Sequence, residues 1–234
     1  MSITGNIDRI EERILNACTR SGRKRDEIIL MGVSKFHPVE AIEQAWIAGL
    51  RFFGESRVQE AAAKFSGFRE GHSGLQLHMV GFLQRNKAKA AVSLFDCIQS
   101  VDREELAGEL AKHAAGQSTA ENPLQVLLEL HTGEDSKSGI AGIDELLRIY
   151  EAILAFPALN VGGLMTMAPD TADEKLIRLA FRKLAAAQRE LKQRFGETAS
   201  PVLSMGMSGD FEIAVEEGST LLRIGSAIFG ERIC

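Results

Sequence analysis

Short apolar runs rich in β-branched residues alternate along the whole chain with longer segments of helical periodicity. Eight such runs are candidate strands: IILMGVS (28–34), RFFGE (51–55), LQLHMVG (75–81), DCIQSV (96–101), QVLLELHT (125–132), LNVGGLMTM (159–167), PVLSMGM (201–207) and TLLRIGS (220–226). The clearest helical segments between them are residues 39–49 and 172–195. This alternation predicts a parallel sheet, because parallel neighbours need a crossover connection, usually a helix.

The number of strands favours closure of that sheet. Eight strands close a (β/α)8 barrel, normally within about 250 residues. An amphipathic helix at about residues 4–20 precedes the first strand, and it could cover the gap left by a missing final helix. The alternative is an open doubly wound sheet, but no GxGxxG motif follows the first strand. We therefore predict an α/β fold with one domain over residues 1–234, a (β/α)8 TIM barrel with an extra N-terminal helix, in which the polar stretch 116–123 is a loop.

Composition and charge exclude several classes of function. The formal net charge of -5 and the pI of about 5.6 argue against a basic nucleic-acid-binding surface. The cysteines Cys18, Cys97 and Cys234 are far apart, so neither a disulfide framework nor a metal site is expected. No apolar stretch approaches the roughly 20 residues that cross a bilayer, and the N-terminal segment lacks the apolar core of a signal peptide. We expect a cytoplasmic protein without nucleic-acid or membrane partners.

Two loops rich in small residues follow the last two predicted strands, SMGMSGD (204–210) and GSAIFG (225–230). In (β/α)8 barrels, phosphate is often held by the loops after these two strands. Glycine lets backbone N–H groups approach an anion closely, and the hydroxyls of Ser208 and Ser226 could add donors. The glycines could instead only form strand-to-helix turns. Because both loops stand on the expected strands, the pattern favours phosphate binding.

Lys35 stands at the carboxyl end of the first predicted strand, which in a closed barrel lies next to the eighth. A lysine partly removed from water more readily exists as the neutral amine, which can attack an aldehyde and form a Schiff base. The alternative is a strand-end lysine that reaches into solvent. With phosphate loops beside it, Lys35 favours a site for pyridoxal 5'-phosphate (PLP).

Arg223 interrupts the apolar run of the last predicted strand. A buried guanidinium needs acceptors because it does not deprotonate. The pyridine nitrogen of PLP is one suitable acceptor, and arginine there would leave that nitrogen unprotonated. The alternative is a structural ion pair with Glu55 or Asp210.

Ordered motifs between about residue 7 and residue 232 also indicate a PLP site. They are VSK (33–35), FGESRVQE (53–60), HMVGFLQRNK (78–87), SKSGI (136–140), GLMTM (163–167), LSMGMSGDFEIAVEEGST (203–220) and LLRIGSAIFG (221–230). Together they resemble the motifs of the YggS/PROSC family of pyridoxal phosphate homeostasis proteins. The resemblance implies a fold type III PLP barrel similar to the N-terminal domain of bacterial alanine racemase, with PLP on Lys35. The cofactor-binding residues that it implies, besides Lys35, are Ser204, Met207, Ser208, Gly225 and Ser226 for the phosphate, Arg223 for the ring nitrogen, and Asn86 and His78 near the cofactor.

A few positions depart from the family pattern or carry more than one interpretation. Ser56 replaces a usual asparagine, which puts any contact from it in doubt, whereas Ser226 replaces a common threonine and keeps the hydroxyl. His78 could equally be a hydrogen-bonded core histidine. Cys97 and Met165 are expected in the core. Lys137 is either a solvated loop charge or a second anchor for PLP.

The same residues bear on whether the protein is an enzyme or a carrier. A racemase needs two proton-transfer groups on opposite faces of the substrate carbon. Lys35 could supply one, and in alanine racemases the other is a tyrosine from a second domain, which we expect to be absent here. The single tyrosine, Tyr150, is expected in a helix outside the barrel. We therefore expect a monomeric PLP carrier or regulator with no catalytic residue, in contact with PLP and with PLP-dependent apo-enzymes. The alternative is a weak PLP-dependent, racemase-like enzyme that uses His78 or a water.

Overall fold

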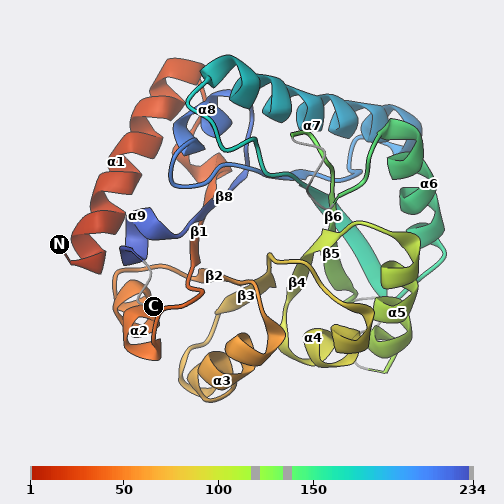
Figure 1. The fold of residues 1–234 in the computed structure, drawn as a ribbon, viewed down its shortest axis with the longest axis horizontal. Coiled ribbons are helices and arrows are strands. Elements are labelled where there is room, and N and C mark those ends of the chain that lie inside the picture. The colour runs from red at the N-terminus through yellow and green to blue at the C-terminus, as the bar shows by residue number, and fades with distance from the viewer. Residues whose placement is uncertain (1, 117–121, 134–138, 232–234) are drawn as a thin grey trace.

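The computed structural model describes residues 2–116, 122–133 and 139–231, and their strands close into one parallel barrel (Figure 1). The strands are β1 (Ile29–Val33), β2 (Phe52–Glu55), β3 (Gln76–Met79), β4 (Cys97–Val101), β5 (Leu124–Glu129), β6 (Leu159–Met165), β7 (Val202–Ser204) and β8 (Leu221–Ile224). They pair in sequence order, and β8 pairs with β1, with Arg223 opposite Met31. The predicted (β/α)8 barrel is confirmed, and the open sheet is excluded.

Most of the strands end earlier than the apolar runs that predicted them. The runs over 201–207 and 220–226 leave the sheet after Ser204 and Ile224. Their last residues instead form loops at the carboxyl ends of the strands. Apolar character marks these residues as buried, but it does not distinguish a ladder residue from a residue packed in the mouth of the barrel.

Helices surround the strands as an outer ring (Figure 1). They are α1 (Ile3–Ser21), α2 (Val39–Ile47), α3 (Val58–Phe68), α4 (Ala88–Leu94), α5 (Glu104–Ala114), α6 (Ile143–Leu154), α7 (Glu174–Phe195), α8 (Phe211–Glu216) and α9 (Ser226–Phe229), with short 3-10 turns η1 (Arg25–Glu27), η2 (Arg69–Gly71) and η3 (Arg85–Lys87). No helix formed by residues 2–116, 122–133 or 139–231 combines the length and the apolar character needed to cross a membrane.

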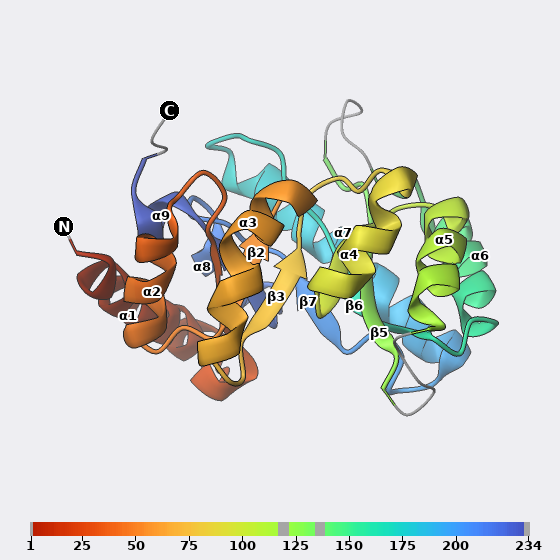
Figure 2. The ribbon, with the colours of Figure 1, turned by 90° about the horizontal axis from the view of Figure 1, so that it is seen from below.

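The extra N-terminal helix covers the ring beside the short α9 that follows the last strand. The Ser2 hydroxyl accepts from Gly5 N–H at 3.2 Å at the start of α1, and Gly22 ends the helix in the left-handed conformation. The helix packs against α2, α8 and α9 (Figure 2). Asn6 Nδ2 donates to the carbonyl of Ile228 at 2.7 Å. The prediction of this helix and of its covering position is confirmed.

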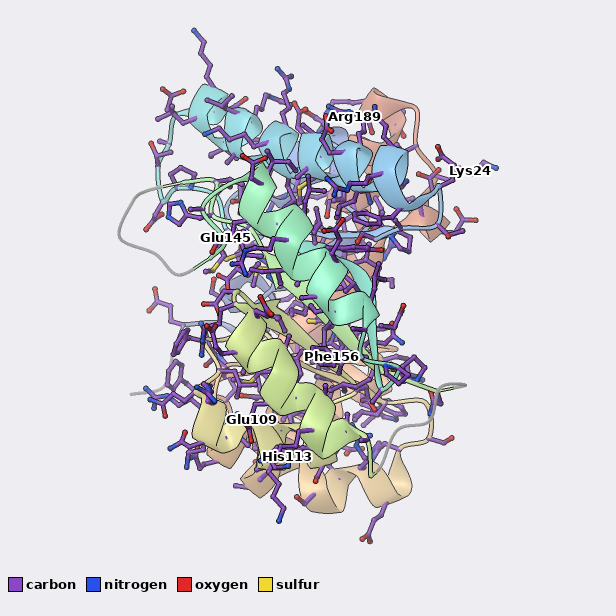
Figure 3. All side chains as sticks on the ribbon, turned by 90° about the vertical axis from the view of Figure 1, so that its right-hand side faces the viewer. Lys24, Glu109, His113, Glu145, Phe156 and Arg189 are labelled. Carbon is purple, nitrogen blue, oxygen red and sulfur yellow. The ribbon has the colours of Figure 1, made fainter. Side chains whose placement is uncertain are left out.

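On the opposite side of the barrel, α5, α6 and α7 form the outer layer (Figure 3). Tyr150 of α6 is buried there, with its ring 4.6 Å from the ring of Phe195. Cys97 and Met165 are buried in a small core cluster, as expected. The Lys137 and Cys234 positions and most of the 116–123 loop lie outside the described residues.

One close approach between strands depends on a glycine. A Cβ on Gly163 of β6 would stand 2.2 Å from the carbonyl oxygen of Val202 in β7, whereas a Cβ on Gly67 of α3 would meet open space. We expect Gly163→Ala to lower the free energy of unfolding by about 2 kcal/mol, because the backbone must shift. Gly67→Ala should raise it by about 0.5 kcal/mol through lower entropy of the unfolded chain. Urea denaturation of both variants checks the pair, and equal effects would contradict this account.

Candidate functional site

A cavity of about 530 Å³ opens at the carboxyl ends of the strands. Its walls come from the end of β1, the segment after β6, and the loops after β7 and β8. The lining residues used below are Lys35, Met207, Ser208, Asp210, Arg223, Gly225 and Ser226. The volume lies within the range of about 300–1,000 Å³ that is typical of small-molecule sites. Six of the nine residues predicted to bind the cofactor therefore line one cavity: Lys35, Met207, Ser208, Arg223, Gly225 and Ser226.

The two loops predicted to hold phosphate are tied to each other across the cavity wall. The N–H of Ala227 donates to the hydroxyl of Ser208 at 3.2 Å, which links the loop after β7 to the first turn of α9. Within the described part of the chain, the backbone N–H groups of Ser208, Gly209 and Gly225 donate to no protein acceptor. Backbone donors without protein acceptors, grouped at the wall of a cavity, suit an anion.

Gly206 allows the loop after β7 to turn so sharply. Its φ is 99°, which side chains rarely tolerate, and an added Cβ would stand 2.6 Å from the Cβ of Ala214. After this tight turn the loop continues directly into α8, which begins at Phe211.

A carboxylate occupies part of the same loop. The N–H of Met207 donates to Asp210 Oδ1 at 2.5 Å, so this donor already has a partner within the protein. Burial raises the pKa of Asp210, and the Met207 N–H and the charge of Arg223 counteract that effect. Met207 therefore lines the cavity, but its N–H is engaged by its own loop.

Lys35 lies in the turn that follows β1, and side chains of α3 hold the backbone of this turn. Phe36, the next residue, has a φ of 67°, in the left-handed region that residues other than glycine seldom adopt. Its N–H donates to Glu60 Oε1 at 2.5 Å, and Lys64 Nζ donates to the carbonyl of Ser34 at 2.9 Å. The backbone on both sides of Lys35 is thus fixed by side chains of one helix.

Glu55 joins this support at the end of β2. Its buried carboxylate accepts from Ser34 Oγ at 2.7 Å and from Lys64 Nζ at 3.0 Å, and Lys64 also donates to Glu60 at 2.7 Å. The second oxygen of Glu55, Oε2, has no hydrogen-bond partner among the residues that the structure describes. Burial raises the pKa of Glu55, although Ser34 and Lys64 act in the opposite direction. One ammonium therefore compensates two carboxylates directly behind Lys35.

Arg223 lies at the floor of the cavity and is held by neutral acceptors. Its Nη1 donates to Ser204 Oγ at 2.7 Å and its Nη2 donates to the carbonyl of Thr166 at 2.8 Å. Among the described residues it forms no ion pair, so the alternative of a salt bridge to Glu55 or Asp210 is wrong. Burial lowers the pKa of Arg223 to about 10, against the attraction of Asp210 and Glu129.

Three predicted site residues lie away from the cavity lining. The Ser204 hydroxyl is fully buried and engaged by Arg223 and Gln99, so it lies beneath the cavity rather than in the phosphate loop. His78 is a buried histidine that accepts a hydrogen bond from Gln99, as its core interpretation predicted. Asn86 is exposed in η3, and the contact expected of it has no support in this geometry.

Sequence reasoning missed Glu129, the last residue of β5. It is buried, and burial together with the negative charge of Asp102 raises its pKa to about 7, whereas Arg223 lowers it. It also missed Gln99 and the Glu55–Lys64–Glu60 group. An acidic or amide residue inside a predicted buried strand was the available signal for Glu129 and Gln99, as it was for Arg223.

The comparisons with known proteins agree with one another. The family model described as the N-terminal domain of alanine racemase matches residues 6–233. The chain is 42% identical over 234 residues to the pyridoxal phosphate homeostasis protein of Vibrio cholerae, covering 99% of this chain and 97% of that one. It is 38% identical over 232 residues to the pyridoxal phosphate homeostasis protein of Aquifex aeolicus, covering 99% of both.

A solved structure extends the similarity to three dimensions. PipY of Synechococcus elongatus, solved with PLP bound, superposes with a TM-score of 0.81 at 34% identity, covering 94% of this chain and 100% of that one.

Lys64 should be essential to the turn behind Lys35. We expect Lys64→Met to lower the free energy of unfolding by about 3 kcal/mol, because it leaves the buried Glu55 and its neighbour Glu60 without their cation. Lys112→Met is the matched control, since Lys112 pairs with Glu109 at 3.5 Å on the surface and its side chain is 71% exposed. Urea denaturation of both variants checks this, and a Lys64 variant as stable as the control would contradict it.

Glu129 should make stability depend on pH. Its pKa is raised from 4.5 to about 7, so the folded protein binds its proton more tightly than the unfolded chain does. The associated stability is present below pH 4.5 and is lost as the pH rises through about 7. We expect Glu129→Gln to match the wild type at low pH and to be more stable by about 3 kcal/mol at pH 8. Denaturation of both proteins from pH 4 to 8 measures the difference in their free energies of unfolding. A difference that does not change with pH would contradict the prediction.

Proposed function

The chain belongs to the family of pyridoxal phosphate homeostasis proteins, and its barrel matches the family model of the alanine racemase N-terminal domain. We propose that it binds PLP reversibly in PLP homeostasis. The observation that carries the proposal is a cavity lined by an amine, a guanidinium and backbone donors that have no acceptor among the described residues. Bound there, PLP would supply an aldehyde, an electron-withdrawing ring and a phosphate.

The residues fit these three parts of the cofactor. Lys35 would hold the aldehyde carbon as a Schiff base, with loss of one water. The N–H groups of Ser208, Gly209 and Gly225, with the hydroxyls of Ser208 and Ser226, would bind the phosphate. Arg223 would donate to the ring nitrogen and keep it unprotonated, which weakens the ring as an electron sink. That assignment suits a protein that stores the cofactor more than one that drives carbanion chemistry.

The position of Tyr150 also favours a carrier. The chain has a single tyrosine, and its ring packs on Phe195 in the outer layer of helices. It therefore cannot reach a substrate on the cofactor as a second proton-transfer group. We propose a cytoplasmic monomer that limits free PLP and passes it to PLP-dependent apo-enzymes.

Covalent trapping tests the assignment of Lys35. Borohydride reduction of the PLP-loaded protein should leave a pyridoxyl group on the peptide that contains Lys35, detected by mass spectrometry. Lys35→Ala should remain unlabelled. Lys89→Ala, which removes an exposed lysine of α4, should label like the wild type. A label on another side chain, or none on the wild type, would contradict the proposal.

A second measurement separates the carrier from a weak racemase-like enzyme. The PLP-loaded protein is incubated with single enantiomers of a small amino acid in deuterated water, and separately with a PLP-dependent apo-enzyme. A carrier should restore the activity of the apo-enzyme and leave the α-carbon free of deuterium. Deuterium that appears with the wild type and disappears with Lys35→Ala would instead support the enzyme.

A further inference from the structure

Four buried side chains form a continuous line of hydrogen bonds beneath the cavity. Arg223 Nη1 donates to Ser204 Oγ at 2.7 Å, Ser204 Oγ donates to Gln99 Oε1 at 2.6 Å, and Gln99 Nε2 lies 2.8 Å from His78 Nδ1. Ser204 and Gln99 are fully inaccessible to solvent. The line starts on β8, passes through β7, crosses the barrel interior to β4 and ends on β3.

The direction of every donor in this line is determined by Arg223. A guanidinium can only donate, so the Ser204 oxygen must accept from it. The single hydroxyl proton of Ser204 then goes to Gln99 Oε1, which orients the amide so that Nε2 faces His78. An amide nitrogen can only donate, and His78 Nδ1 must therefore accept. His78 is consequently neutral, with its proton on Nε2.

The surroundings of His78 agree with a neutral ring. The side chain is buried, its ring meets that of Phe52 edge-on at 5.8 Å, and burial lowers its pKa to about 4 against the attraction of Asp96. A protonated His78 would need an acceptor at Nδ1. Gln99 could supply one only by turning its amide, and the buried hydroxyl of Ser204 would then lose its acceptor.

We propose that Gln99 and His78 are positioning residues that fix the guanidinium of Arg223 against the cofactor cavity through Ser204. The inference rests on the proposed function, because PLP is the ligand that Arg223 would meet. It also assigns Ser204 to the support of Arg223 instead of to the phosphate. The carbonyl of Thr166 holds the second nitrogen of the same guanidinium at 2.8 Å, so two bonds orient the plane of Arg223.

The tautomer of His78 tests the line without any ligand. Long-range ¹⁵N–¹H spectra of the ligand-free wild type at pH 7 should show His78 protonated on Nε2 only. In Gln99→Glu both oxygens accept, so His78 should carry a proton on Nδ1, as the other tautomer or as the imidazolium. A protonated Nδ1 in the wild type, or an unprotonated Nδ1 in folded Gln99→Glu, would overturn the proposal.

A double-mutant cycle tests the effect on the cofactor. Gln99→Leu removes the hydrogen bonds of Gln99 to Ser204 and His78 at similar side-chain volume. We expect it to weaken PLP binding by about tenfold when Arg223 is present. In an Arg223→Met background the same change should have no further effect, because the residue that it positions is gone. An equal loss in both backgrounds would indicate general disruption of the barrel and overturn the proposal.

The spectroscopic test and the binding test can be contradicted independently of each other. If the wild type did not bind PLP, the proposed function and the cofactor half of this inference would both be overturned. The spectra would still decide whether Gln99 orients His78 and Ser204, because they require no cofactor.

Discussion

The pairing of β8 with β1 is the interaction on which the site depends. It places Arg223 opposite Met31 and brings the loop after β8 beside Lys35. In an open sheet with the same strand order, β1 and β8 would lie at opposite edges, and the amine would be far from the loops after β7 and β8. Closure also directs all strand ends to one mouth, where backbone donors and side chains from several loops can surround one small molecule.

Within that frame, the protein surrounds its cavity with charges that are only partly compensated. Lys64 supports two carboxylates, and Arg223 is bound by a hydroxyl and a carbonyl. In the described part of the chain, one oxygen of Glu55 has no partner and Arg223 forms no ion pair with a carboxylate. Such arrangements reduce stability relative to an apolar core. They also restrict side-chain positions sharply, since each buried donor and acceptor has few alternative partners. The rigid turn at Lys35 and the fixed plane of Arg223 both follow from this restriction.

Much of this could be predicted from the sequence, because the signals were local. The alternation of apolar runs predicted the strands, and the small residues after the last two runs predicted two loops that line the cavity. The positions of three other predicted residues could not be inferred from local signals: Ser204, His78 and Asn86. Their motifs indicated proximity to the cofactor, but whether a side chain faces the cavity or lies beneath it depends on register around the barrel. Gln99 meets Ser204 across the interior from a strand three places away, and no spacing in the sequence encodes that contact.

The position of the site within the sequence has a consequence for biosynthesis. Lys35 follows the first strand, and the loops that complete the cavity follow the last two, about 170 and about 190 residues later. A growing polypeptide on the ribosome would expose the amine long before its anion-binding partner existed. The vitamin B6 aldehyde could therefore be captured with full affinity only after β8 has been translated. A filled cavity would then indicate that the barrel has closed.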